Sequence, residues 1–290
     1  MSDITVIKRD GQVTQLDLEK IHKMVELACR GLAGVSESAV EMNANLQIFD
    51  GIKTEDIQEI LIKSANDLIS LDAPNYQFVA ARLLLFGLRK AVYNGHPDGH
   101  PTVLEQLEKG VELGVYDKPL INAYSREEWE EINSFVEHDR DYLFTYAGLR
   151  QVTDKYLVQD RSAGKIFETP QFMYVLIAAT LFQQYPQETR LEYIRRYYDA
   201  ISQHKINIPT PIMGGVRTPL RQFASCVLVD VDDTLDSIFS SDMAIGYYVA
   251  QRAGIGINAG RIRGINSKIR GGEVQHTGVV PFLKKFESTV

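Results

Sequence analysis

The chain reads Pro209-Thr-Pro-Ile-Met-Gly-Gly-Val-Arg-Thr-Pro-Leu-Arg-Gln-Phe-Ala-Ser-Cys-Val-Leu-Val-Asp230 in the stretch that decides its fold. Cys226 begins a short apolar run that is typical of a buried strand, and Gly254-Ile-Gly-Ile-Asn258 is a second such run. A helix is predicted between them, from about Asp233 to Gln251. Strand, helix and strand with intervening glycines are typical of an α/β sheet or barrel.

Glycine and proline are so frequent in this stretch and up to Gly272 that several turns crowd together, which lets main chain approach a ligand closely. Guanidinium groups among glycines suit phosphate. Six arginines fall in this region: Arg217, Arg221, Arg252, Arg261, Arg263 and Arg270. Cys226 is a possible nucleophile, but no nearby histidine is singled out, so composition alone favours a buried structural cysteine.

The composition indicates a soluble protein with locally acting basic groups. The 290 residues carry a formal net charge of -7, which argues against nucleic-acid binding through bulk charge. Two cysteines, Cys29 and Cys226, cannot form a disulfide framework and favour a reducing compartment. No signal peptide is recognisable, and the longest apolar run, 172–182, is shorter than the ~20 residues of a membrane span. A cytoplasmic protein is predicted.

The first part of the chain predicts a β-hairpin followed by four helices. Two β-prone runs, Ile4–Arg9 and Gln12–Leu16, flank Asp10-Gly11, a tight-turn dipeptide. Helices are expected after a cap at Asp17, over 37–49, after a cap at Thr54, and over 76–90. Cys29 adjoins the buried stripe of the first helix and is interpreted as a structural thiol.

A Gly- and Pro-rich linker, 93–101, precedes a mainly helical region that reaches residue 203. His96 and His100 in the linker are interpreted as solvated residues rather than metal ligands. Ser125 and Glu128 form a capping box, and residues 138–141 are a structural ion-pair cluster. The remaining expectations are a hairpin from runs 156–158 and 165–168, helices over 170–184, 188–202 and 279–290, and a strand over 206–209.

Familiar nucleotide motifs are missing from the sequence. Gly254-x-Gly256-x-x-x-Gly260 departs from dinucleotide-binding spacing, and no phosphate loop is present. Longer strings are distinctive: Arg217-Thr-Pro-x-Arg-Gln-Phe-x-Ser-Cys-Val227, Gln251-Arg-Ala-Gly-Ile-Gly-Ile-Asn-Ala-Gly-Arg-Ile-Arg263, Arg270-Gly-Gly-Glu-x-x-His-Thr-Gly278, Val6-Ile-Lys-Arg-Asp-Gly11 and Asp50-Gly-Ile-Lys-Thr54. Together they resemble the large (α) subunit of class Ia ribonucleotide reductase, of the type found in enteric bacteria and T-even-like phages.

The resemblance runs from about Ile4 to Val290 and covers less than half of the usual subunit. It implies an α+β chain with an ATP-cone over 1–93, a helical N-terminal domain over 94–220 and the first part of an α/β ten-stranded barrel, left incomplete, over 221–290. It implies an oxidoreductase component that helps reduce ribonucleoside diphosphates for DNA synthesis and is inactive without the C-terminal portion and the small subunit. The alternative is a non-catalytic nucleotide-binding regulatory fragment.

The resemblance also assigns residues to the reaction. Cys226 matches one of the two thiols that reduce the substrate, and the second thiol lies outside this sequence. The substrate-contacting positions are Thr210, Ser225, Ala253 and Gly254. Simpler structural interpretations are also open: Thr210 between two prolines as a turn only, and Ala253-Gly254 as a site of close packing only.

Effector sites are implied in two places. Residues matching the specificity site, where a deoxynucleoside triphosphate selects the substrate, are Asp233, Thr234, Leu235, Arg263 and Arg270. Residues matching the ATP contacts of the cone are Lys8, Thr14, Gln15, Leu16, Asp17, Leu18, Glu19, Lys20, Thr54 and Lys90. Without the resemblance, Asp233 reads as a helix cap and the lysines as solvated. Gln58 and Gly87 stand where bacterial relatives have histidines, which leaves inhibition by dATP open.

The implied partners are the C-terminal part of the large subunit, a radical-bearing small subunit, thioredoxin or glutaredoxin, and a ribonucleoside diphosphate. No metal is expected in this chain, because the radical cofactor belongs to the small subunit. A naturally split subunit is expected, with truncation as the alternative. A homodimer of completed subunits is expected, with Ile238, Met243, Ile245 and Val249 partly serving the contact.

Overall fold

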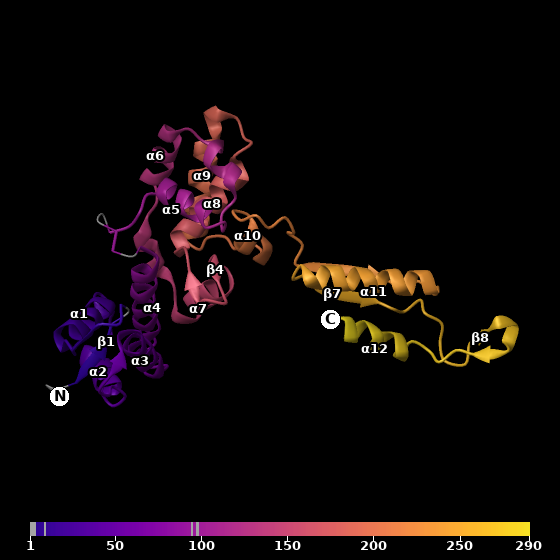
Figure 1. Cartoon of the computed structure of the whole chain (residues 1–290), viewed down its shortest axis with the longest axis horizontal. Coiled ribbons are helices and arrows are strands. Elements are labelled where there is room, and N and C mark those ends of the chain that lie inside the picture. Colours follow the sequence, from indigo (N-terminus) through magenta and orange to yellow (C-terminus); the bar gives the residue numbers. More distant parts are fainter. Residues whose placement is uncertain (1–3, 9, 94, 97–98) are drawn as a thin grey trace. The chain divides into compact units, whose positions relative to one another are not determined.

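The structure is a computed structural model that describes residues 4–8, 10–93, 95–96 and 99–290. Arg9 of the first predicted strand, and residues 94, 97 and 98 of the predicted linker, lie outside the described residues. The chain divides into two compact units (Figure 1). Unit 1 comprises Met1–Ile208 and Val216–Pro219, and unit 2 comprises Pro209–Gly215 and Leu220–Val290.

Unit 1 begins with a three-stranded sheet in the order β2 (Val13–Gln15), β1 (Thr5–Ile7), β3 (Ile52–Lys53). β1 and β2 are antiparallel, which confirms the predicted hairpin, and Gly11 adopts a positive φ of 82° in its turn. β3 pairs parallel with β1 and was not predicted. Asp50 fixes this pairing, since its carboxylate accepts hydrogen bonds from the backbone N–H and the hydroxyl of Thr5, both at 2.7 Å.

Four helices complete this part: α1 (Leu18–Cys29), α2 (Glu37–Asn45), α3 (Thr54–Asp67) and α4 (Tyr76–Tyr93). The cap at Asp17 is confirmed, because its carboxylate accepts from the backbone N–H of Lys20 at 3.1 Å. The cap at Thr54 was wrong: Lys53 occupies the cap position without a side-chain bond, because the chain passes directly from β3 into α3. Cys29 is 5% exposed, and burial raises its pKa to about 11, in agreement with a structural thiol.

The rest of unit 1 is mainly helical, as expected. Its elements are α5 (Val103–Glu112), η1 (Lys118–Ala123), α6 (Arg126–Ser134), η2 (His138–Leu143), α7 (Tyr146–Lys155), β4 (Gln159–Asp160), β5 (Lys165–Ile166), α8 (Pro170–Phe182) and α9 (Gln187–Ser202). The capping box of Ser125 and Glu128 is confirmed. The predicted hairpin is also present, as the antiparallel pair β4 and β5.

The cluster around residues 138–141 consists of ion pairs, as predicted. Arg140 contacts Asp199 at 2.6 Å, and the guanidinium of Arg89 on α4 contacts the carboxylate of Asp141 at 3.2 Å. Asp141 is fully buried, and burial raises its pKa to about 6 even though Arg89 acts in the opposite direction. The last turns of α4 are therefore tied to η2, in the helical region.

Unit 2 contains α10 (Thr210–Gly215), β6 (Cys226–Asp230), α11 (Leu235–Ala250), β7 (Gly254–Asn258), β8 (Lys268–Ile269), η3 (Arg270–Gly272), β9 (Val274–Gln275) and α12 (Val280–Thr289). The predicted strand, helix and strand are confirmed: β6 and β7 are parallel, and α11 connects them and packs beside them (Figure 1). The burial predicted for the first strand was wrong, because no residue of β6 is buried. The strand predicted at 206–209 was wrong, because this segment is irregular and Pro209 leads directly into α10.

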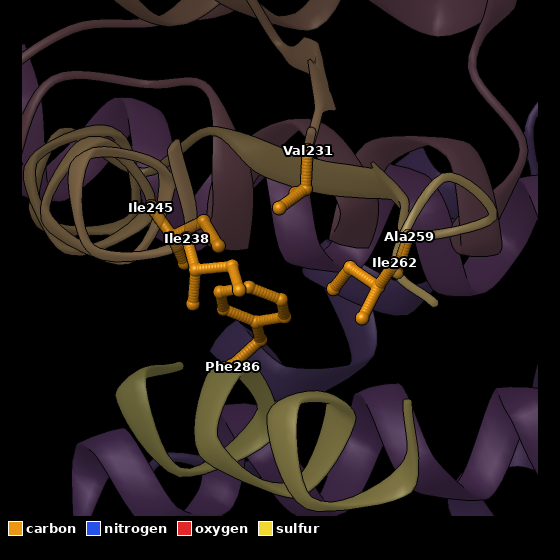
Figure 2. Packing of buried hydrophobic residues seen from close by; sticks show 6 residues of the cluster. All are labelled: Val231, Ile238, Ile245, Ala259, Ile262 and Phe286. Carbon is orange, nitrogen blue, oxygen red and sulfur yellow. The ribbon is translucent and has the colours of Figure 1, made fainter. Parts of the chain in front are cut away.

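A small hydrophobic core holds unit 2 together. Side chains from the two strand ends, α11 and α12 converge on it (Figure 2): Val231, Ile238, Ile245, Ala259, Ile262 and Phe286. Within the described residues, β6 and β7 form a two-stranded sheet and no barrel is closed. No helix in the part of the chain that the structure describes is long and apolar enough to cross a membrane.

Candidate functional site

The exposed thiol of Cys226 lies at the amino end of β6, where β6 and β7 begin side by side. Cys226 pairs with Gly254 in the parallel register, and the backbone N–H of Gly254 donates to the carbonyl of Ser225 at 2.8 Å. Ala253, just before β7, is buried. Four of the predicted residues are thus brought together around one accessible sulfur. The reading of Cys226 as a buried structural cysteine was wrong.

Thr210 lies on a different element of the same unit. It is the exposed first residue of α10, so the interpretation of a simple turn between two prolines was wrong.

The two cysteines are expected to differ sharply in reactivity. At pH 8 iodoacetamide should label one site in the native chain, Cys226, and two after denaturation. The reason is that Cys226 is exposed, whereas Cys29 is buried with a pKa raised to about 11 by burial. Roughly one Cys29 thiol in a thousand is ionised at that pH. Peptide mapping by mass spectrometry measures the sites, and labelling of Cys29 in the native chain at a rate equal to that of Cys226 contradicts this expectation.

A second group of predicted residues meets at the start of α11. Asp233 accepts from the backbone N–H of Arg263 at 3.0 Å and from its guanidinium Nε at 2.7 Å. These bonds, the backbone one first, lower the pKa of Asp233. Thr234 is the helix cap, since its hydroxyl accepts from the N–H of Ser237 at 3.1 Å, so the reading of Asp233 as the cap was wrong. The exposed Leu235 follows, and a fixed carboxylate and a guanidinium flank a helix N-terminus.

The other arginines of the region separate into different environments. Arg270 is exposed at a positive φ of 49°, between the short strands β8 and β9. Arg261 pairs with Asp230 at 2.8 Å. Arg217 is completely buried against Glu168 and is not available to phosphate, so its inclusion among the phosphate-binding candidates was wrong. Nothing in the local sequence identifies these acidic partners, which lie far away along the chain.

Two predicted ATP contacts of the cone, Lys8 and Thr54, lie where β1 and β3 end. Ile7 is paired with Lys53, so the residues that follow in these parallel strands, Lys8 and Thr54, emerge side by side. The segment 14–20 runs in the opposite direction, since β2 is antiparallel to β1: Gln15 pairs with Thr5 at the start of β1, and the chain then enters α1. Lys90, exposed on α4, lines a groove of about 650 Å³ together with Glu55, the neighbour of Thr54. Lys8 and Thr54 therefore lie together, while the part of the segment that enters α1 starts from the opposite end of the sheet.

Gln58 and Gly87 are neighbours in this groove. The side-chain amide of Gln58 donates to the backbone carbonyl of Leu83 at 2.6 Å. A Cβ atom at Gly87 would lie 3.4 Å from Cγ of Gln58, so the glutamine side chain rests on the glycine. The two positions form one local surface between α3 and α4.

The reading of His96 and His100 as solvated residues was wrong, because His96 is only 24% exposed in its side chain and lies 3.9 Å from the carboxylate of Glu105. His100 packs its ring against His138 at 3.9 Å between ring centres, and burial lowers the pKa of His138 to about 3. Among the described residues, no group of three or more His, Cys, Asp or Glu side chains is arranged to hold a metal ion.

Comparison with known proteins covers most of the chain. Residues 4–91 match the ATP cone domain, residues 142–221 the ribonucleotide reductase all-alpha domain and residues 224–290 the ribonucleotide reductase barrel domain. The chain is 52% identical over 288 residues to ribonucleoside-diphosphate reductase 1 subunit alpha of Escherichia coli. It is 44% identical over 292 residues to ribonucleoside-diphosphate reductase subunit alpha of Enterobacteria phage T4. The matches take in 99% and 100% of this chain but 38% of the length of each relative.

Proposed function

Since the chain belongs to the class Ia ribonucleotide reductase large-subunit family, we propose that it contributes to the reduction of ribonucleoside diphosphates to deoxyribonucleoside diphosphates. The observation that carries this proposal is the exposed thiol of Cys226 beside Gly254, within residues 224–290 that match the reductase barrel domain. A thiol that serves as reductant has to reach its substrate, and an exposed sulfur at the end of a paired strand meets that requirement.

In the proposed reaction Cys226 is one of two thiols that supply the electrons. After the 3′ hydrogen is removed by a thiyl radical elsewhere in the completed subunit, the bond between C2′ and its oxygen breaks and water leaves. The two thiols give two electrons and two protons and become a disulfide, and the 3′ hydrogen returns to the sugar. Thioredoxin or glutaredoxin then reduces the disulfide. Thr210, Ser225, Ala253 and Gly254 are proposed to hold the ribose and diphosphate.

The test of this function uses the completed enzyme, defined as a large subunit whose N-terminal portion is residues 1–290 of this sequence, with its radical-bearing small subunit and a dithiol reductant. We expect CDP to be converted to dCDP when an effector is present. If the assembled large and small subunits bind nucleotides but form no dCDP, the reductase proposal is wrong and the chain acts as a regulatory nucleotide-binding fragment.

The start of α11 is proposed as a specificity-effector site formed by Asp233, Thr234, Leu235, Arg263 and Arg270. Backbone N–H groups at a helix N-terminus and nearby guanidinium groups suit a triphosphate, and a carboxylate accepts from a ribose hydroxyl. The Asp233 carboxylate is held in place by Arg263. This preorganisation supports the proposal.

Asp233→Asn is expected to weaken deoxynucleoside triphosphate binding at this site by about tenfold, because one charge-assisted hydrogen bond is lost. Isothermal titration calorimetry with dTTP measures the change in the dissociation constant. Asp236→Asn is the matched control, since Asp236 is an exposed acid in the first turn of the same helix. Equal affinities of the Asp233 variant and the control would show that Asp233 has no part in effector binding.

ATP is proposed to bind the cone through Lys8, the segment 14–20, Thr54 and Lys90. The match of residues 4–91 to the ATP cone domain implies nucleotide binding, and the convergence of Lys8 and Thr54 at one sheet end supports these contacts. A cytoplasmic location is also proposed, because the presence of only two cysteines favours a reducing compartment.

The completed subunits are proposed to form a homodimer through α11. Its exposed face carries a stripe of apolar side chains: Leu235, Phe239, Met243 and Tyr247. Of the residues predicted for this contact, Ile238 and Ile245 are buried in the core of unit 2 and are not available to a partner. Val249 is partly buried against the same core, whereas Met243 is exposed. The stripe repeats at helical spacing, so it presents one continuous face.

A further inference from the structure

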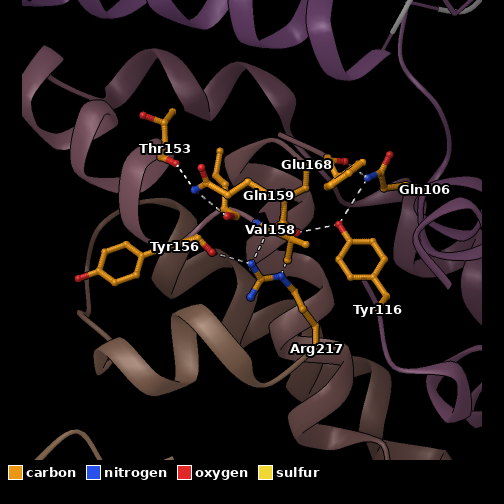
Figure 3. A network of polar contacts seen from close by, with 10 residues as sticks. Gln106, Tyr116, Thr153, Tyr156, Val158, Gln159, Glu168 and Arg217 are labelled. Atoms are coloured by element: carbon orange, nitrogen blue, oxygen red, sulfur yellow. Dashed lines mark hydrogen bonds and ion pairs between the residues drawn. The ribbon is translucent and has the colours of Figure 1, made fainter. Parts of the chain in front are cut away.

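Arg217 lies at the centre of a buried polar network in unit 1 (Figure 3). Its guanidinium Nε donates to Glu168 Oε2 at 2.9 Å, and its Nη2 donates to Glu168 Oε1 and, at 3.0 Å, to the carbonyl of Tyr156. Glu168 also accepts from the hydroxyl of Tyr116 and from the N–H of Val158, both at 2.7 Å. Arg217 and Glu168 are each 0% exposed.

This network joins several elements of the helical region to one residue. Tyr156 ends α7, Glu168 precedes α8, and Tyr116 lies between α5 and η1. The backbone takes part as well, because the carbonyl of Arg217 accepts from the N–H of Asp117 at 3.0 Å. Two parallel bonds from a planar guanidinium to one carboxylate define direction as well as distance. The side chain and main chain of Arg217 are therefore fixed in one orientation.

The place of Arg217 in the chain is unusual. Val216–Pro219 belongs to unit 1, although the residues before it, Pro209–Gly215, and after it, from Leu220 onward, belong to unit 2. Residues 220–225 have no regular secondary structure and are mostly exposed. Between Thr210 and Cys226, the segment Val216–Pro219 is therefore the part of the chain that is held in unit 1, through the bonds of Arg217.

Stability alone gives a weak reason for such an anchor. A buried ion pair is costly to desolvate, and apolar residues of similar volume often stabilise a core as well or better. What the pair supplies is a defined position, because an apolar side chain slides or rotates where a bidentate ion pair does not.

We propose that Arg217, held by Glu168, is a positioning residue for substrate reduction, which fixes the stretch that carries Thr210 on one side and the Cys226 thiol on the other. This inference rests on the proposed role of Cys226. Arg217 touches no substrate; it acts through the position of the two residues that do.

The test compares the completed enzyme with the double variant Arg217→Met/Glu168→Gln, which removes both charges at similar side-chain length. We expect a folded protein with unchanged ATP and dTTP binding, a kcat/KM for CDP at least tenfold lower, and a need for at least tenfold more CDP to protect Cys226 from iodoacetamide. The protection assay measures how well bound CDP shields the Cys226 thiol from iodoacetamide, and it does not depend on turnover.

The matched control is Arg190→Met/Glu128→Gln, which removes another largely buried ion pair of unit 1, while glutamine retains the capping box. Its kcat/KM and CDP protection are expected to equal those of the parent. Equal values in both double variants overturn the positioning role, as does an equal loss in both. If the first double variant does not fold, Arg217→Lys is used in its place, since it keeps the charge and loses the bidentate geometry. The same two quantities are compared with the parent: kcat/KM for CDP and the CDP concentration that protects Cys226.

The two proposals fail in different ways. If the Cys226→Ser enzyme still forms dCDP, the proposal that this thiol reduces substrate is wrong. If activity depends on Cys226 but is unchanged when the Arg217–Glu168 pair is replaced, the reductase function is retained and only the positioning role of Arg217 is wrong.

Discussion

Cys226→Ser is expected to abolish dCDP formation by the completed enzyme. A serine hydroxyl has nearly the shape of the thiol, but it cannot give up electrons to form a disulfide. In the proposed reaction the thiol pair therefore cannot reduce the substrate radical. Product should fall to the level seen without the large subunit, while the affinity for CDP changes little. The expected effect is large because, in the proposed reaction, the thiol is a reactant that is oxidised in every turnover.

Quantification of dCDP by chromatography measures this result, and isothermal titration with ATP and dTTP checks that both effector sites remain. Cys29→Ser is the matched control, since Cys29 is the buried cysteine of α1 and has no proposed part in the reaction. Full activity of the Cys226 variant would falsify the assignment. Loss of activity in both variants points to a folding defect and calls for the same comparison with Cys29→Ala.

Glu168→Gln alone is expected to lower the free energy of unfolding of unit 1 by about 3–5 kcal/mol, because it leaves the guanidinium of Arg217 buried without its counter-charge. Burial acts to lower the pKa of Arg217, while the charge of Glu168 raises it, so the arginine remains charged in the folded parent. Thermal unfolding followed by circular dichroism should show a midpoint about 10 °C lower.

The control for this prediction is Glu192→Gln, which removes the partner of Arg196 on the exposed face of α9. An exposed pair of this kind contributes less than about 1 kcal/mol, because water screens both charges. Adding Arg217→Met to Glu168→Gln is expected to recover part of the lost stability. A Glu168 variant as stable as the Glu192 variant would contradict the importance of the buried pair.

Sequence patterns were sufficient where structure is local. The unit of β6, α11 and β7 followed from two apolar runs with a helical pattern between them, and the cap at Asp17 followed from its position before an amphipathic stretch. These features depend on neighbours in the chain. The roles of Cys226 and of the effector residues came from the family resemblance and stay predictions.

Features that depend on distant partners could not be predicted. β3 has two residues, Ile52–Lys53, too few for a periodic pattern, and its pairing with β1 determines that Thr54 begins a helix without capping it. Arg217 looked like one of several phosphate ligands, but its acid is 49 residues away in the chain. The partner of Asp233, Arg263, is 30 residues away. Only the fold brings such charges together.

The helix α4 limits how freely the cone could be replaced by that of another protein. It starts among the cone helices and ends against η2, where Arg82 and Arg89 lie over the ring of Tyr142 and Arg89 meets the buried Asp141. A cone transplanted from another protein would bring its own α4. It would keep these contacts only if it also carried an arginine at the position of Arg89, because Asp141 would otherwise be buried without a positive partner.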